Sequence, residues 1–502
     1  MTSPSPKRPV QSIIETGLLV DVECRITNGL PAIVIVGFAN RSIDEAKERL
    51  RGAFSASGLV LPRKRITLNL APGDVPKDGT GFDLAMAVAI MLAEQSGLSV
   101  GSSIIVGELS LDGGVRPVRG IIGKLLAARS LDIKRCFIPA GNLAQAQLVP
   151  GLELLPVANL QAMYEHLLNL SPIPPVTGKP LISVTQPAKP AVNLQLIAGQ
   201  PLGKRALEIA AAGGHNLLFT GPPGTGKTML AKALPGILPP LRPAEVLEVT
   251  HLHSLASLRF DQIITERPFR NPHHSSSLKA LIGGGSGPTP GEISLSHHGV
   301  LFLDELPEFQ RATIESLRQP MEDGVVSVAR SRQTVEFPAQ FTLVATANPC
   351  PCGYWGFGHA CRCTANQINR YQRKLSGPIL DRIDLSTDVI STEHEQILKH
   401  HPKAETSATV AQRVANARAR QLKRQKTLNS RLDNKGVQRH AHLTPAAEHF
   451  LNHQALKTNL SARAYLKTVK VGRTIADLAG SEQIELDHIT EALGLRHQKQ
   501  EL

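Results

Sequence analysis

The first 170 residues alternate between two patterns of hydrophobic and polar positions. Short apolar runs that alternate with polar residues predict strands, and apolar residues spaced three or four apart predict helices. The predicted strands are 17–26, 32–36 and 66–70, and the predicted helices are 42–54 and 84–93. The mixture of the two kinds of element predicts an α/β domain over residues 1–170.

A run of prolines divides the chain. Six prolines lie between residues 171 and 190, and because proline fixes φ and removes a backbone donor, we expect a semi-rigid linker over 171–191. The order of helix, strand, Gly-rich turn and helix after it predicts a nucleotide-binding α/β core over 192–393. Its predicted elements are a helix at 202–212 and strands at 216–220, 299–303 and 341–346. Helical periodicity then predicts a helical domain over 394–502.

The charge of the chain suggests a kind of partner. The 502 residues include 55 Lys and Arg against 42 Asp and Glu, a net charge of +13. This excess favours a polyanion, with nucleic acid ahead of an anionic membrane surface. Ten basic and two acidic residues fall between positions 403 and 439, where a solvated helical face is the alternative to direct DNA contact.

The sequence also indicates the cellular compartment of the protein. The longest apolar run, 84–93, is far shorter than the roughly 18 residues of a membrane-spanning helix, and the N-terminal segment MTSPSPKRPV lacks the apolar core of a signal peptide. Six cysteines in so long a chain do not make a disulfide framework. We therefore expect a cytoplasmic protein with no membrane partner.

Residues 221–228 match the pattern G-x-x-x-x-G-K-T between a predicted strand and a predicted helix. Small residues let the backbone N–H groups surround a phosphate chain. We expect Lys227 to reach the β- and γ-phosphates and the Thr228 hydroxyl to hold Mg²⁺. The predicted nucleotide-binding residues are Gly221, Pro222, Pro223, Gly224, Thr225, Gly226, Lys227 and Thr228, with Asp304 discussed below, and the predicted cofactors are ATP and Mg²⁺.

Polar residues end the two apolar strands that follow. The strand 299–303 runs into Asp304 and Glu305, and the strand 341–346 is followed by Asn348. Strand ends of a parallel sheet meet at its ligand edge, so we expect Asp304 to bind Mg²⁺ through water and Glu305 to activate the attacking water. An amide at Asn348 suits a γ-phosphate sensor. The pair of acids predicts hydrolysis of the nucleotide as well as binding.

These motifs, in this order, resemble those of AAA+ ATPases of the Mg-chelatase/MCM-like branch. Four further segments resemble the ComM family of competence proteins more narrowly; they are RPFRNPHHS at 267–275, GEISLSHHG at 291–299, LPEF at 306–309 and NPCPCG at 348–353. The resemblance implies a homo-hexameric ATPase that acts as a branch-migration helicase on single-stranded and branched DNA during natural transformation. It also implies a recombinase as a candidate partner.

The resemblance assigns further residues. Arg382 corresponds to an arginine finger supplied to a neighbouring subunit, and Arg463 to a sensor in the helical lid, although either arginine alone is more often a surface ion pair. Alternating apolar residues in 324–337 predict a β-hairpin, which corresponds to the pore hairpin of this branch, with Arg330 and Arg332 at its tip as DNA contacts. Lys279, in the Gly-rich segment 275–291, falls in a second pore insertion.

The N-terminal domain resembles the Lon-protease fold. Residues 76–83, PKDGTGFD, align with the segment that carries the nucleophilic serine of true Lon proteases. Here that position is Gly81, and Lys124 aligns with the general base. A Ser/Lys dyad needs its hydroxyl, so we expect a non-proteolytic scaffold domain.

Four of the six cysteines form two close pairs, Cys350 with Cys352 and Cys361 with Cys363, within an insert at 349–364. Two such pairs suit a tetrahedral Zn²⁺ site. The spacing C-x-C is tighter than the usual C-x₂-C, and four reduced thiols without a metal are the alternative. We expect the other two cysteines, Cys24 and Cys136, in the core.

Three other functions compete with a DNA motor. A chelatase-type motor that remodels a protein partner shares the ATPase module, but the basic charge and the extra Lon-like domain oppose it. An ATP-dependent protease is opposed by Gly81. A DNA-binding scaffold without enzymatic activity is opposed by the complete set of nucleotide motifs.

Overall fold

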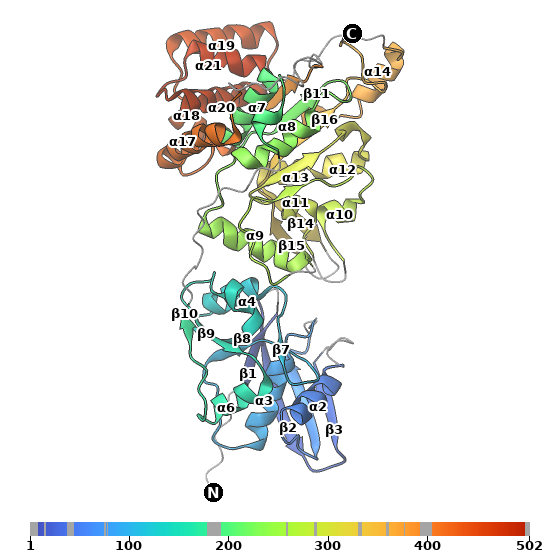
Figure 1. Cartoon of the computed structure of the whole chain (residues 1–502), viewed down its shortest axis with the longest axis vertical. Helices are drawn as coiled ribbons and strands as arrows, with labels where there is room; N and C mark the ends of the chain where they lie inside the picture. The colour runs from blue at the N-terminus through green and yellow to red at the C-terminus, as the bar shows by residue number, and fades with distance from the viewer. Residues whose placement is uncertain are drawn as a thin grey trace. The chain divides into compact units, whose positions relative to one another are not determined.

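The computed structural model describes residues 9–496 except 15–16, 38–44, 75–76, 78, 178–191, 258–259, 286–288, 330–333, 358–360, 376 and 392–403. The chain divides into two compact units (Figure 1), Met1–Ser183 with Arg242–Thr265, and Val184–Leu241 with Glu266–Leu502. The segment 242–265 differs from the sequence-based division, which places it in the ATPase core. In the structure, helix α9 (Pro243–Ala256) packs on α4 (Ile121–Ser130), where Gly123 lets the His251 ring approach closely.

The first unit is built on a mixed sheet of eight strands in the order β10-β9-β8-β5-β1-β2-β4-β3. The strands are β1 Val10–Ile13, β2 Leu19–Thr27, β3 Ala32–Val36, β4 Arg65–Ala71, β5 Ser103–Ile105, β8 Arg135–Pro139, β9 Glu153–Val157 and β10 Val176–Thr177, with a small hairpin of β6 Glu108–Leu109 and β7 Val115–Arg116. Helices α2 (Ala46–Ala56), α3 (Asp83–Glu94), α5 (Leu143–Ala146) and α6 (Leu160–Leu167) complete the unit. The predicted α/β class is confirmed.

Helix α3 forms the centre of this unit because its apolar residues face inward on every side. Its residues from Asp83 to Leu92 are all buried. A helix that is hydrophobic all round belongs in a core. Strand β10, inside the predicted linker 171–191, pairs antiparallel with β9 and so belongs to the sheet; residues 178–191 lie outside the described residues.

The second unit holds a sheet of five parallel strands in the order β12-β13-β16-β11-β17. They are β11 Leu217–Thr220, β12 Phe269–Arg270, β13 Val300–Leu303, β16 Thr342–Ala347 and β17 Leu385–Asp388. Helices α7 (Pro201–Gly213) and α8 (Lys227–Ala233) bury the Leu217 and Phe219 side chains of β11. Strand β11 lies between two strands that come later in the chain, so the order of the sheet reverses beside it, where α/β proteins bind ligands.

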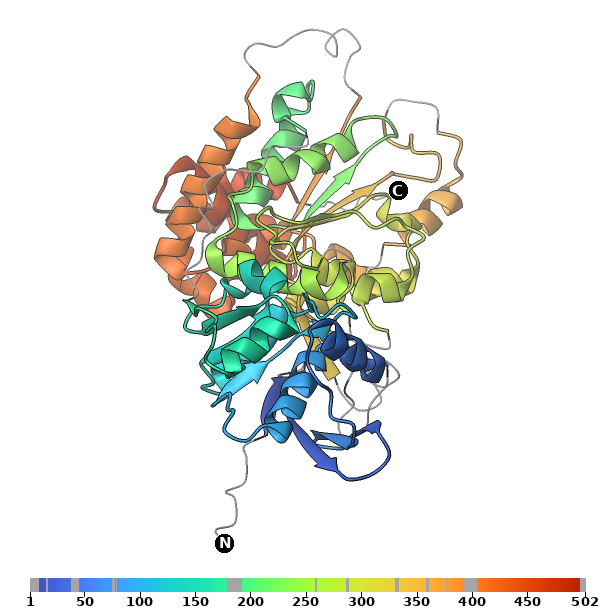
Figure 2. The same cartoon turned by 60° about the horizontal axis from the view of Figure 1, so that its bottom comes forward.

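Among the described residues after the core, the structure has five helices, as the periodicity predicts. They are α17 Ser407–Gln425, α18 Asn434–His440, α19 Pro445–Lys457, α20 Ala462–Ala479 and α21 Leu486–Gly494. They gather together (orange to red in Figure 2), and α17 and α20 pack on α7. Much of their basic charge is used internally: Arg413 pairs with Glu208, and Arg424 pairs with Asp477. These two arginines are held by ion pairs within the second unit.

A two-stranded hairpin of β14 (Val325–Ala329) and β15 (Thr334–Pro338) confirms the predicted hairpin. Helices α11 (Glu292–Leu295) and α13 (Arg318–Asp323) pack against β14. The other short helices of this unit are α10 Leu278–Ile282, α12 Arg311–Ser316, α14 Ala365–Gln372 and α15 Gly377–Leu380. Within the described ranges, none of the helices has the length and apolar content needed to span a membrane.

Candidate active site

The P-loop follows β11 at the carboxyl edge of the parallel sheet. Thr220 of β11 pairs with Ala347 of the neighbouring strand β16. The Gly221 N–H, one residue later, donates to the Ala347 carbonyl at 3.2 Å. Gly224 and Gly226 have φ of 77° and 93°, a region that glycine adopts without steric cost. The sequence folds here into a loop that ends at α8, as the motif predicts.

Lys227 lies at the base of this loop and is 8% exposed. Its ammonium donates to the Gly221 and Pro222 carbonyls at 2.6 and 2.7 Å and to Asn348 Oδ1 at 3.2 Å. Burial lowers the pKa of Lys227, while Asp304 and Glu305 oppose that shift. The predicted phosphate ligand and the predicted sensor amide are thus in direct contact.

Thr228 and Asp304 form the second contact of the site. Thr228 Oγ1 donates to Asp304 Oδ2 at 3.1 Å, and Thr346 Oγ1 donates to Asp304 Oδ1 at 2.6 Å. A hydroxyl and a carboxylate are oxygen donors of the kind that Mg²⁺ prefers. These two residues fit the predicted ion, and Thr346 orients the carboxylate.

Glu305 follows Asp304 but is exposed, so its carboxylate is open to water. Its φ of 52° is in the left-handed region, which costs a non-glycine residue roughly 1–3 kcal/mol and is found preferentially at functional sites. The Glu305 N–H donates to Thr346 Oγ1 at 2.8 Å. This bond holds the two acids in their different positions, one facing Thr228 and one facing solvent.

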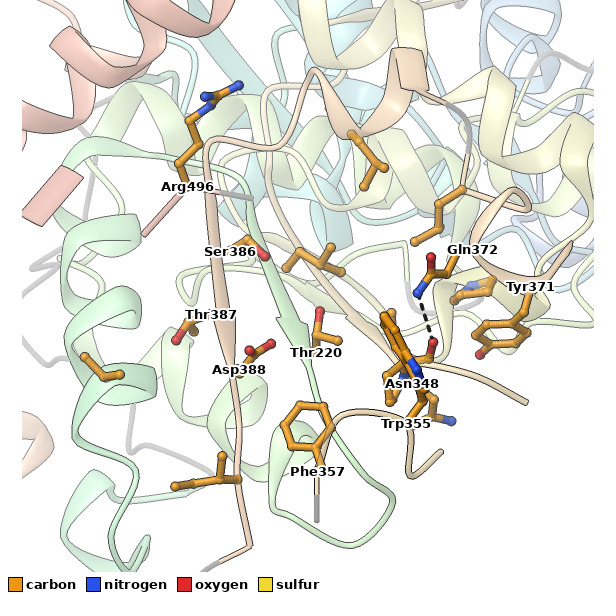
Figure 3. Close-up of a pocket in the computed structure, with 18 of the residues that line it drawn as sticks. Thr220, Asn348, Trp355, Phe357, Tyr371, Gln372, Ser386, Thr387, Asp388 and Arg496 are labelled. Atoms are coloured by element: carbon orange, nitrogen blue, oxygen red, sulfur yellow. Dashed lines mark hydrogen bonds between the residues drawn. The ribbon is translucent and has the colours of Figure 1, made fainter. Parts of the chain in front are cut away.

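A pocket of about 1020 Å³ adjoins the P-loop. Thr220, Asn348 and Asp388 line it from the ends of three parallel strands, and Trp355 and Phe357 line it from the cysteine-rich insert (Figure 3). Its lining mixes apolar and aromatic side chains with polar ones such as Gln372 and Arg496, and residues 221–228 are not part of it.

Gln200 connects this pocket to the P-loop. It precedes α7, lines the pocket and is 7% exposed. Its side-chain amide donates to the Ile390 carbonyl at 2.5 Å and to the Thr225 carbonyl at 3.4 Å. Gln200 was not predicted from the sequence, because a single glutamine before a helix has no distinguishing pattern.

The two predicted arginines share one carboxylate. Arg382 Nη2 is 2.7 Å from Glu322 Oε2, and Arg463 Nη2 bonds to the other oxygen of Glu322. The bond from Arg382, followed by that from Arg463, lowers the pKa of Glu322. Glu322 was not identified from the sequence, because it is one of many acids on predicted helices.

Arg382 lies at the opposite edge of the sheet from the P-loop of its own chain. Its carbonyl accepts from Asn216, which precedes β11, whereas the P-loop follows the other end of that strand. A four-residue strand is about 13 Å long. Arg463 lies beside Arg382 through their shared Glu322, so both arginines are remote from the phosphates that their own P-loop would bind.

The four clustered cysteines converge. Their sulfurs all lie within 4.8 Å of one another, and three of the separations are 3.3, 3.5 and 3.7 Å. Zn–S bonds of about 2.3 Å place tetrahedral sulfurs about 3.8 Å apart. Backbone N–H groups of Tyr354 and Arg362 lower the pKa of Cys352 to about 6, whereas burial and the neighbouring thiols raise the pKa of Cys361 and Cys363. The separations of the sulfurs fit Zn²⁺, whereas Cys136 is buried and Cys24 half-buried in the first unit.

The predicted DNA contacts are described only in part. Arg330 and Arg332 lie outside the described residues. Lys279 is exposed on α10, and its side chain and Val328 of β14 both come close to Gly284. The insertion that carries Lys279 therefore lies beside the hairpin.

The Lon-like position in the first unit has room for a side chain. A Cβ on Gly81 would meet Val106 and Val118 at 3.7 Å, an ordinary contact. Lys124 is 7% exposed on α4; burial, and then the charge of Lys124, lower the pKa of His251. The backbone at Gly81 thus leaves room for a Cβ, although the sequence supplies no nucleophile there.

Family models match three parts of the chain. They are described as magnesium chelatase, subunit ChlI, at residues 193–397; subunit ChlI of Mg-chelatase, at 22–142; and magnesium chelatase, subunit ChlI C-terminal, at 404–496.

Similar curated proteins cover almost the whole chain. It is 42% identical over 480 residues to the uncharacterized protein YifB of Escherichia coli, covering 95% of this chain and 94% of that protein. It is 42% identical over 483 residues to the competence protein ComM of Haemophilus influenzae, again covering 95% and 94%. A stretch of 165 residues is 27% identical to the Lon protease of Lachnoclostridium phytofermentans, covering 30% of this chain and 20% of that protein.

Proposed function

Because this chain belongs to the ComM family of Mg-chelatase-type AAA+ proteins, we propose that it is an ATP-driven motor that moves branched DNA as a hexameric ring. The family implies an ATPase. The finer activity that we propose, branch migration during recombination in natural transformation, is what the family resemblance implies; a relative that is 42% identical, from Haemophilus influenzae, is named a competence protein.

The observation that carries the proposal is the separation of the hydrolytic residues into two groups. Lys227, Thr228, Asp304 and Asn348 contact one another at the carboxyl edge of the sheet. Arg382 lies at the other edge with Arg463. An arginine at the phosphates raises the rate of hydrolysis by roughly 10³–10⁵. A single chain therefore has the binding half of one site and the arginine half of another, which supports assembly into a ring.

The chemistry at each half follows from the residues present. Lys227 and the P-loop N–H groups bind the phosphates of ATP, and Thr228 and Asp304 hold Mg²⁺, which supplies charge neutralisation when bound. Glu305 accepts a proton from the attacking water, and Asn348 orients the γ-phosphate. We also propose Zn²⁺ as the ion of the cysteine cluster, because the separations of the sulfurs suit it.

DNA as the partner is supported by charge and by the position of Lys279. The net charge is +13, and the insertion that carries Lys279 lies beside the β14–β15 hairpin, which we propose faces the ring's pore with Arg330 and Arg332 at its tip. We propose a recombinase as a partner on the DNA, a cytoplasmic location, and a non-proteolytic scaffold role for the Lon-like domain, because Gly81 supplies no nucleophile.

The proposal is tested with the full-length protein, ATP and a fluorescent, mobile four-way junction. Native gels should show conversion of the junction into its duplex products, and Lys227→Ala, which cannot bind the phosphates, should give none. A wild-type protein that hydrolyses ATP and leaves every junction unchanged would favour the chelatase-type alternative, a motor that remodels a protein.

A further inference from the structure

The cysteine cluster contacts the nucleotide site as well as holding its own loop. Gly353 lies between the two cysteine pairs, with φ of 85°. A Cβ at Gly353 would lie 2.6 Å from Cδ of Pro223 in the P-loop, a distance that real Cβ atoms do not reach. The loop of the cysteine cluster is therefore packed directly on the P-loop.

The same loop continues from the sensor residue. Asn348, which accepts from Lys227 at 3.2 Å, is followed by Pro349 and Cys350. The Pro349 carbonyl accepts from Gln372 at 3.4 Å (Figure 3), and Cys350 is completely buried. A change in the position of Cys350 would thus be transmitted within two residues to the amide that contacts Lys227.

The loop also supplies the aromatic wall of the pocket. The Trp355 N–H donates to Cys350 Sγ at 3.4 Å, and the Trp355 side chain lines the pocket with Phe357, Thr220 and Asn348. Figure 3 shows Trp355 beside Asn348 and Phe357 below Thr220. The backbone N–H of Trp355 is hydrogen-bonded to Cys350 Sγ, one of the proposed zinc ligands. A metal bound by the sulfurs would therefore fix the position of the Trp355 ring.

We infer that Zn²⁺ bound by Cys350, Cys352, Cys361 and Cys363 holds this loop against the P-loop, so that zinc occupancy sets the affinity of the ATP site. The inference rests on the proposed ATP and zinc sites. Metal binding to a cysteine set contributes folding free energy to the segment that carries it. Here that segment includes a wall of the pocket and the residue that touches Pro223.

The chain contains its own reporter, because Trp355 is its only tryptophan. Energy transfer from Trp355 to a fluorescent N-methylanthraniloyl-ADP measures nucleotide binding at the P-loop, on which this loop packs. Full-length protein purified without chelator should contain one zinc per chain by mass spectrometry. Removing it should weaken binding roughly tenfold, within the usual range of coupling between two sites, and added Zn²⁺, but not Mg²⁺, should restore it.

Two pairs of variants separate the effect of zinc binding from the effect of the packing between Gly353 and Pro223. The double change Cys361→Ser and Cys363→Ser should lose zinc and affinity together, whereas Cys24→Ser, outside the cluster, should lose neither. Gly353→Ala should keep zinc and lose affinity. Gly356→Ala is the matched control, because Gly356 has a similar φ of 80° but nothing within 4 Å of its Cβ.

The outcomes distinguish the inference from the function on which it rests. A protein that neither contains nor takes up zinc overturns the metal site. Zinc removal or Gly353→Ala with unchanged nucleotide affinity overturns the coupling. Zinc-loaded protein that fails to bind the nucleotide analogue, with circular dichroism showing it folded, contradicts the proposed ATPase itself and the inference with it.

Discussion

The guanidinium of Arg382 is bound to the carboxylate of Glu322 at 2.7 Å, at the amino edge of the sheet. Arg463 occupies the other oxygen of the same carboxylate. Two arginines to which the sequence assigns separate roles therefore lie together. Both lie away from the P-loop of the same chain, as the proposed supply of Arg382 to a neighbouring subunit requires.

Arg382→Ala should bind ATP but lose most of its hydrolysis, by a factor on the order of 10³. When it is mixed with Lys227→Ala, which has an intact arginine and no phosphate ligand, phosphate release should partly recover, because one subunit completes the site of the other. Arg370→Ala, at an exposed position on α14, is the control and should be fully active. Absence of recovery in any mixing ratio would argue against action between subunits.

Glu305→Gln should retain ATP binding and slow hydrolysis by roughly 10²–10⁴, the usual contribution of a general base. The amide keeps the size of the side chain and cannot accept the proton of the attacking water. Binding and phosphate release, measured on the same preparation, separate the two effects. Glu308→Gln is the matched change, since Glu308 pairs with Lys374 at 3.2 Å instead. Equal activity of the two variants would remove the role of Glu305.

The first unit should lose stability as the pH falls below 6.5. Burial, and then the charge of Lys124, lower the pKa of His251 to about 4, whereas an unfolded histidine titrates near 6.5. Between these values the unfolded state binds more protons, so acid favours unfolding, by on the order of 2 kcal/mol for this half-buried ring. Protection factors for hydrogen exchange in α4, which correct for the slower intrinsic exchange in acid, should fall accordingly at pH 4.5. His251→Leu should show less of this dependence; an identical dependence would exclude His251 as its source.

Lys279→Ala should weaken binding to single-stranded DNA and lower the slope of log affinity against log salt by about one, as loss of one phosphate contact does. Lys457→Ala, at an exposed position on α19, carries the same change of charge away from the hairpin and should leave the slope unchanged. Fluorescence anisotropy over a series of salt concentrations measures both. The same slope for Lys279→Ala and wild type would exclude the contact.

The sequence predicts those site residues that belong to a short motif or follow directly on a strand. The P-loop motif and the acids after β13 need only strand ends, and the register Leu303 with Ala345 then brings Asp304 beside Thr346. Glu322 and Gln200 were missed because their importance depends on partners that are distant in the chain. No local pattern reports such contacts.

For the fold, the positions of several helices and strands were predicted, but the packing between distant segments was not. Strands β3 and β11 and helix α3 lie within a residue or two of their predicted positions. The assignment of α9 to the first unit was not predicted, because packing between α9 and α4 joins segments more than a hundred residues apart. Periodicity predicts that an element exists, but the surface it buries against depends on the whole chain.

The most direct test of the DNA motor is ATP hydrolysis by the full-length protein without DNA, with single-stranded DNA and with a mobile four-way junction, at two salt concentrations. The account predicts strong stimulation by DNA that falls as salt rises, because phosphate contacts release counterions. Hydrolysis that is the same with and without every DNA would contradict it.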